Sequence, residues 1–460
     1  MNDLNKQKGS GLALLPFLIF IVVYMGTGLI LQAQGVDMAF YQLPAPIAAM
    51  VAIIFAFLLF KGTMDEKFDA FIKGCGDDNI IIMCIIYILA GAFSTVSKAM
   101  GGVDSTVYFA LSIIPPQFIT AGIFIISCFI SISTGTSVGT IVAVGPIAVG
   151  LAENAGLNFP MVIAALIGGA MFGDNLSVIS DTTIAATRTQ NCDMRDKFKM
   201  NIKMALPAAV LTVILLLIFG KPVNVVEAET YTYSIIKMVP YILVLVTALM
   251  GVNVFVVLVG GILASGAIGI LSGDFGFLQL GQLTYEGFIG MFEIFILSIL
   301  IGGLANMVNK AGGIEWLLTK IRGMIKGRKS AEIGIAALVS LTDAATANNT
   351  VAIIIDGPIA KEISTEYKVD PRRSASLLDS FSCIMQGLIP YGAQMLIALG
   401  FTNGAVSAFE VIPLLWYQLL LGVFAIVSIF VPFTDGLIKK DPWNFEYDMP
   451  DSKVAELKAK

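Results

Sequence analysis

Apolar stretches of bilayer-spanning length recur along the whole chain, with short polar segments between them. A helix needs about 20 mostly apolar residues to cross a bilayer, so the pattern predicts membrane helices rather than a β-barrel. Several stretches are short or interrupted by Gly, Pro and polar residues, which predicts broken helices and hairpins that enter and leave on one side. The predicted segments are 12–32, 44–60, 79–98, 117–132, 136–152, 159–180, 203–220, 235–250, 252–271, 288–307, 333–346, 349–360, 374–398 and 411–432.

The composition agrees with an all-α polytopic membrane protein. Of the 460 residues, 57% are hydrophobic and 13% are charged, whereas a soluble protein has about 25% charged residues. The first apolar stretch lacks a small-residue cleavage site, so we expect a retained helix rather than a signal peptide. The net charge of −5 gives no indication of nucleic-acid binding, and five scattered cysteines without any histidine predict no metal cofactor. A transported proton must therefore use a carboxylate, a lysine or water.

Two parts of the chain resemble each other. Residues 91–104 match residues 302–315, and Gly145–Ala148 matches Gly357–Ala360, both at a separation of about 211 residues. This repetition predicts two related halves. The predicted organisation is an N-terminal segment 1–11, a first half 12–220, a connecting loop 221–234, a second half 235–432 and a polar tail 433–460.

The charges of the connecting segments predict that the two halves have opposite orientations. Basic loops stay in the cytoplasm, and each basic segment in one half corresponds to a segment without Lys or Arg in the other. The basic segments are 61–78, 185–203, 310–330 and 361–373, and their counterparts are 272–287, 400–410, 99–116 and 152–160. Inverted repeats of this kind are typical of secondary transporters. We therefore predict both termini on the cytoplasmic side of the inner membrane, and we leave open whether the protein forms a homodimer.

The stretch 173–183 is the first candidate site. It places two acids at the end of an apolar segment, where lipid offers no partner for a polar group. A polar loop just outside the bilayer is the alternative, but it does not explain why no Lys or Arg accompanies the acids. The predicted ion- and proton-binding residues of this stretch are Asp174, Asn175, Ser177, Ser180, Asp181 and Thr182, with Na⁺ held by Asp174 and Asp181.

Two further polar interruptions look like the tips of helical hairpins at matching places in the halves. Hydroxyl and carbonyl oxygens suit a dehydrated Na⁺, and helix N-termini favour a carboxylate. Helix packing by small residues explains the first tip about as well, but it explains Asp343 and the two asparagines of the second tip poorly. The candidates are Asp343 for an ion and Ser133, Thr134, Thr136, Ser137, Thr346, Asn348, Asn349 and Thr350 for a substrate.

The second half also has a polar stretch opposite 173–183, in which Ser382 and Gln386 are candidate substrate ligands. Gln386 corresponds to Asp174, so the two halves offer different chemistry at equivalent places. Two other acids lie in apolar surroundings but are weaker candidates for the site. Glu293 could be a proton site or pair with a lysine, and Asp356 precedes Gly357-Pro358 as an ordinary helix-end residue would.

The sequence Gly173-Asp-Asn-Leu-Ser-Val-Ile-Ser-Asp-Thr182, preceded by Gly135-Thr-Ser-Val-Gly-Thr140, resembles the NhaC family of Na⁺/H⁺ antiporters. The family pattern is G-T-S-x-G-T followed by G-D-K-x-S-P-x-S-D-T, and residues 133–187 match it best. Asn175 replaces the lysine of this pattern, and Val178 replaces the proline. The loss of the lysine changes the charge at the site and leaves the transported species open.

The resemblance implies a secondary transporter that exchanges Na⁺ for H⁺. Burial favours the protonated form of a carboxylate and a bound cation favours the ionised form, so one acid can exchange the two. The alternative is a Na⁺- or H⁺-coupled transporter of an amino acid or carboxylate. A channel or a membrane enzyme is the third candidate, but the sequence contains neither a nucleophile–base pair nor a nucleotide motif, and we predict that the protein is not an enzyme.

Overall fold

The computed structural model describes residues 9–34, 36, 42–177, 180–222, 232–250 and 252–458. Residues 1–8 of the predicted N-terminal segment, most of the connecting loop 221–234 and Val178 therefore lie outside the described residues. Within the described residues, nine helices are long and apolar enough to cross a bilayer, or ten if one bent pair counts as a single span. The predicted multi-pass helical architecture is confirmed.

The first half is built almost entirely of helices. Its elements are η1 (Gly11–Leu14), α1 (Leu15–Ala33), α2 (Ala45–Leu59), α3 (Met64–Cys75), α4 (Asp78–Ala99), α5 (Gly102–Ile113), η3 (Pro116–Phe118), α6 (Ile119–Thr134), α7 (Ser137–Asn154), α8 (Phe159–Leu176), α9 (Asp181–Gln190) and α10 (Met194–Phe219).

The second half is also helical, and a small tail follows it. Its elements are α11 (Ile235–Leu249), α12 (Val254–Ser272), α13 (Phe277–Gly290), α14 (Phe292–Lys310), α15 (Gly313–Met324), α16 (Arg328–Thr346), α17 (Asn349–Tyr367), α18 (Pro371–Leu388), α19 (Ala393–Gly400), α20 (Ala408–Val411), η4 (Ile412–Leu414), α21 (Trp416–Phe430), α22 (Gly436–Lys440), β1 (Trp443–Asn444), β2 (Met449–Pro450) and α23 (Asp451–Lys458).

Each half contains a helical hairpin with a polar tip, as predicted. α6 and α7 are joined through Gly135, and α16 and α17 through Ala347; both residues are left-handed, with φ of 70° and 52°. The next residue caps the returning helix in both hairpins, since Thr136 accepts from the Gly139 N–H and Asn348 from the Val351 N–H. A left-handed residue ends a helix, and a polar cap starts the next one.

Each half also contains a long helix that breaks and restarts. α8 ends at Leu176, before the end of the predicted segment 159–180, and α9 starts at Asp181. In the second half, Pro390 lies in the break between α18 and α19, where proline cannot donate a helical hydrogen bond. The described residues of the stretch 173–183 therefore flank a helix interruption, and most of them are buried.

The interruption lies deep in the molecule because α8 is a central helix. Every residue from Met161 to Leu176 is buried. A Cβ added at Gly169 would lie 2.3 Å from the Phe124 carbonyl oxygen, and one at Gly173 would lie 2.3 Å from the Ser131 Cβ. This pair of glycines, four residues apart, lets α8 approach α6 closely, as in other membrane helix pairs.

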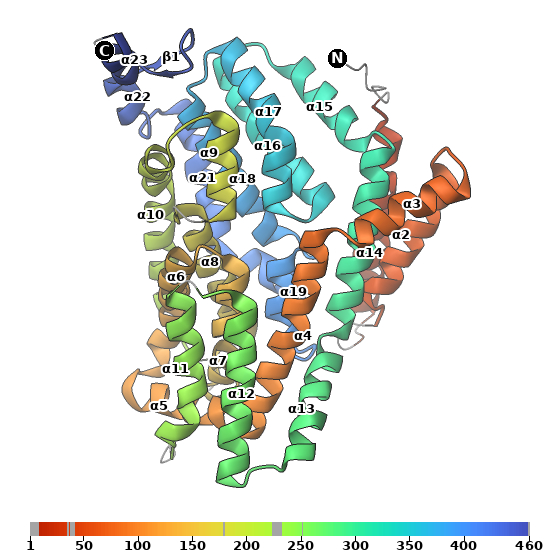
Figure 1. Ribbon diagram of the computed structural model, residues 1–460, viewed down its shortest axis with the longest axis vertical. Helices are drawn as coiled ribbons and strands as arrows, with labels where there is room; N and C mark the ends of the chain where they lie inside the picture. The colour runs from red at the N-terminus through yellow and green to blue at the C-terminus, as the bar shows by residue number, and fades with distance from the viewer. Residues whose placement is uncertain are drawn as a thin grey trace.

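The ends of the molecule differ in charge. Figure 1 shows α9, α15, α17 and the C-terminal tail at one end, with α5 and α13 at the other. Three of the basic segments, 185–203, 310–330 and 361–373, thus share an end. Some of their residues are nevertheless not loop charges as predicted: Lys197, Arg372 and Arg373 are fully buried, because α10 and α18 begin before or at these residues and carry them inside.

Candidate functional site

The two hairpin tips and the two helix breaks meet at one cavity of about 200 Å³, which we call the central cavity. It brings together groups from both halves that are far apart in sequence. The polar residues that line it are Thr136, Ser137, Asp174, Asp181, Thr182, Asn348, Asn349, Thr350, Gln386 and Gln394. Nine of these ten are sequence-predicted site residues, so the predicted stretches do converge.

Asp174 is the buried carboxylate of the central cavity. Its Oδ2 accepts a hydrogen bond from the Ser137 hydroxyl at 2.9 Å, and its Oδ1 accepts one from the Ser180 hydroxyl at 2.5 Å. Ser180 is also 2.9 Å from the Thr182 hydroxyl. Neutral hydroxyl groups, rather than a basic side chain, therefore satisfy the Asp174 oxygens, and a small cation could replace them as partner.

A chain of hydrogen bonds connects Asp174 to the second half. The Gln386 amide donates to the Gln394 Oε1 at 2.7 Å, and the Gln394 amide donates to the Ser137 hydroxyl at 3.0 Å. Ser137 in turn donates to Asp174. Because α7, α8, α18 and α19 all contribute, any relative motion of the halves would change the partners of Asp174.

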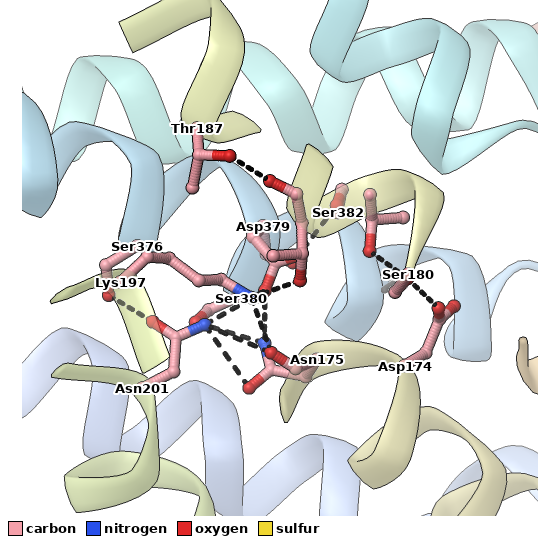
Figure 2. Close-up of polar contacts among 12 residues, drawn as sticks. Asp174, Asn175, Ser180, Thr187, Lys197, Asn201, Ser376, Asp379, Ser380 and Ser382 are labelled. Atoms are coloured by element: carbon pink, nitrogen blue, oxygen red, sulfur yellow. Dashed lines mark hydrogen bonds and ion pairs between the residues drawn. The ribbon is translucent and has the colours of Figure 1, made fainter. Parts of the chain in front are cut away.

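Beside the central cavity lies an ion pair that the sequence analysis did not predict (Figure 2). Lys197 of α10 and Asp379 of α18 are both fully buried, with 2.6 Å between Nζ and Oδ2. The same Oδ2 accepts hydrogen bonds from the Asn201 and Asn175 side-chain amides at 2.9 and 3.0 Å. Ser376 donates to the Asn201 Oδ1 at 2.5 Å. Such a dense set of partners is what allows a buried charge pair to persist.

Lys197 also contacts the residue that replaces the family's lysine. Its Nζ donates to the Asn175 carbonyl oxygen at 2.6 Å and to the Thr183 hydroxyl at 2.7 Å. With Asp379, these bonds occupy the three donors of the ammonium group. The positive charge absent at position 175 is therefore supplied next to that position by another helix.

The remaining predicted residues lie in three kinds of place. Asp181 is exposed at the start of α9 and lines the central cavity, and Asn349 lines it with a buried side-chain amide nitrogen that has no partner among the described residues. Others bond to nearby backbone: Ser177 to the Ile132 carbonyl, Ser133 to Phe129, Thr134 to Thr136, Thr346 to Thr342 and Ser382 to Asp379. Asp343 does not line the central cavity.

Five residues in and beside the cavity were not predicted from the sequence: Lys197, Asn201, Ser376, Asp379 and Gln394. One signal could have found two of them. Ser376, Asp379 and Ser380 have the three- and four-residue spacing of one helix face. Lys197 and Asn201 lie in the basic segment at the start of α10, where their four-residue spacing does not stand out from the neighbouring charged residues.

The broken helices and the polar cavity between two helical halves define a membrane transporter rather than an enzyme. The chain belongs to the Na⁺/H⁺ antiporter family, whose model matches residues 6–221 and 222–433. The resemblance seen in the motifs is thereby confirmed over nearly the whole chain.

Relatives that are named for different transported species match the chain over most of its length. It is 23% identical to the malate-2H⁺/Na⁺-lactate antiporter of Bacillus subtilis, over 87% of this chain and 92% of that protein. It is 22% identical to the Na⁺/H⁺ antiporter NhaC of Alkalihalophilus pseudofirmus, over 85% and 89%. It is 23% identical to the arginine/ornithine antiporter ArcD of Halobacterium salinarum, over 86% and 88%. Among solved structures, the Alcanivorax borkumensis YdaH transporter is 12% identical, covers 92% of this chain and 98% of its own, and has a TM-score of 0.39.

Proposed function

We propose that Na⁺ and H⁺ compete for Asp174 in the central cavity and that this competition couples their exchange. The observation that supports the proposal is a buried carboxylate at a helix interruption whose hydrogen-bond donors, among the described residues, are hydroxyl groups. An ionised Asp174 would bind Na⁺ with help from nearby hydroxyl and amide oxygens, whereas a protonated Asp174 would release it. Asp181, exposed in the same cavity, would attract cations to it.

Alternating access would follow from movement of one half against the other around this cavity. The matching hairpin tips and helix breaks support two related halves, and the three basic segments that share one end support opposite orientations. By the positive-inside rule that end would face the cytoplasm and carry both termini, in the inner membrane.

The proposal predicts that Asp174→Asn abolishes Na⁺-dependent proton movement in proteoliposomes. The amide keeps the size of the side chain but can neither ionise nor bind a proton reversibly. Asp65→Asn, which changes an exposed acid at the start of α3, is the control and should keep wild-type exchange. Wild-type rates and Na⁺ affinity in Asp174→Asn would contradict the proposal.

A second candidate is exchange of a small carboxylate or amino acid together with the cation. The observation in its favour is that two hairpin tips direct the N-termini of α7 and α17 toward the central cavity, where they would stabilise an anionic group. Uptake of labelled lactate, malate, arginine and ornithine under Na⁺ and H⁺ gradients tests it, and absence of uptake under every gradient would exclude these four substrates.

A further inference from the structure

The hairpin of the second half contains two buried carboxylates outside the central cavity. Asp343 lies in the last turn of α16 and Asp356 lies in the middle of α17, and both have 0% exposed surface. The expectation that Asp356 is an ordinary helix-end residue is therefore wrong: α17 continues through Pro358 to Tyr367. The corresponding positions of the first half, Ser131 and Val144, carry no charge.

These carboxylates lack the partners that buried charges need. Asp356 Oδ1 accepts a hydrogen bond from the Thr342 hydroxyl at 3.2 Å. Its Oδ2 and both oxygens of Asp343 are buried and have no hydrogen-bond partner among the described residues. The buried ion pairs of the described residues involve Asp370, Asp379 and Glu332 instead.

Two ionised carboxylates cannot coexist in such a place, because burial without a partner costs several kcal/mol for each charge. A bound proton removes the charge of a buried carboxylate and leaves a neutral carboxyl group, which burial favours. A metal cation is a poorer occupant, since hard cations collect about six oxygens and Thr342 is the one hydroxyl bonded to these acids among the described residues.

We propose that Asp343 and Asp356 are protonated carboxyl groups and form a second proton-binding site, separate from Asp174. This inference rests on the proposed function and extends it: a transport cycle would move a proton from this site in addition to the one that competes with Na⁺ at Asp174.

One residue, Ala347, lies between the two acids and the central cavity. The Ala347 N–H donates to the Asp343 carbonyl oxygen at 2.7 Å, and the Ala347 carbonyl oxygen accepts from the Gln386 amide at 3.3 Å. Ala347 lines the cavity and has the left-handed backbone of the hairpin tip. The hairpin tip therefore connects the second site to the central cavity.

The test is infrared difference spectroscopy of the purified protein while the pH is stepped, with and without Na⁺. A buried protonated carboxyl has a C=O stretching band at higher frequency than an exposed one. We expect Asp343→Asn and Asp356→Asn each to remove part of this band, and the double variant to remove it. Asp65→Asn is the control for an exposed acid, and Asp174→Asn should keep the band. An unchanged band in the double variant would overturn the proposal.

A transport measurement gives an independent readout. In proteoliposomes held at a set membrane potential, the reversal point of Na⁺/H⁺ exchange reports the number of protons moved per cycle. Asp343→Asn should lower that number by one while Na⁺ transport continues, and an unchanged number would contradict the proposal. If the wild-type protein shows no Na⁺/H⁺ exchange, the proposed function fails, whereas the infrared result still decides whether the pair holds a proton.

Discussion

Lys197 shows how a single buried charge can depend on its surroundings. Its ammonium group has acceptors on α8, α9 and α18, and its partner Asp379 has two amide donors in addition. In a buried pair, much of the attraction offsets the cost of removing both charges from water. Loss of one partner then leaves the other uncompensated in the interior.

We therefore predict that Lys197→Met destabilises the protein by about 3–5 kcal/mol, because Asp379 would remain buried without its cation. Chemical unfolding in detergent measures the change. The double variant Lys197→Met with Asp379→Leu should recover most of the loss, since neither charge is then stranded. Lys199→Met, which changes an exposed lysine on the same helix, should change stability by less than about 0.5 kcal/mol.

The acids and hydroxyls of the site were predictable at this scale, but its lysine was not. Asp174 and Ser137 stand out because polar groups are rare within apolar segments. Lys197 lies in a basic segment at the end of a span, where the positive-inside rule assigns lysines to a cytoplasmic loop. Only the rotation of α10 about its axis decides that Lys197 faces inward while Lys199 is exposed.

At the scale of helices, the contact between α6 and α8 positions the carboxylate of Asp174. Gly169 and Gly173 bring the two helices so close that a side chain at either position would collide with α6. Asp174 directly follows Gly173, so the separation of the helices also sets the distance between Asp174 and the neighbouring hairpin tip.

We predict that Gly169→Ala costs about 1–3 kcal/mol of stability and reduces Na⁺/H⁺ exchange. The new Cβ would lie 2.3 Å from the Phe124 carbonyl oxygen, so the backbones must separate. Thermal unfolding and proteoliposome exchange measure the two effects. The matched control is Gly122→Ala on α6, where a Cβ meets nothing within 4 Å; equal losses in both variants would show that the close approach is unimportant.

Hairpins and breaks were predictable because Gly, Pro and polar residues interrupt apolar runs. Short helices at the ends of the molecule were not. α5 and α15 fall in segments 99–116 and 310–330, which the hydrophobic pattern predicts as connections, and each starts after a left-handed glycine, Gly101 or Gly312. With 12 residues each, they are too short to be recognised as membrane spans in the sequence, and packing against neighbouring helices stabilises them.

At the scale of the whole molecule, the C-terminal tail joins helices from both halves. Trp443 lies over Lys361 of α17 and Arg372 of α18. Asp448 accepts hydrogen bonds from Lys361 at 2.5 Å and from Asn191, the residue that ends α9, at 3.1 Å. The sequence predicted only a polar tail here, because a two-residue strand pair has no periodic signal to detect.

The tail contacts predict a specific pH dependence. Burial alone would raise the pKa of Asp448, but the hydrogen bonds from Lys361 and Asn191 outweigh it and hold the pKa below its usual value. A lowered pKa means that Asp448 stabilises the docked tail fully at neutral pH. This contribution disappears as the pH falls from about 4 through the lowered pKa.

In a variant with Trp316 and Trp416 replaced by Phe, the fluorescence reports on Trp443 alone. Its emission maximum should therefore stay constant from about pH 8 to 5 and shift to the red only under stronger acid. Asp448→Asn should weaken docking at pH 7 by about 0.2–1 kcal/mol, because the carboxylate is half exposed. Glu456→Gln, which changes an exposed acid on α23, is the control. Release of the tail between pH 7 and 6 would contradict this assignment.

The contact between Lys197 and position 175 has an evolutionary consequence. Because the two residues are in contact, a lysine at either position places one positive charge at the same site. A second lysine there would not be needed. Across relatives, we expect lysine to alternate between the two positions as a covarying pair. A motif search that requires lysine at position 175 would then miss antiporters whose lysine is at position 197 on α10.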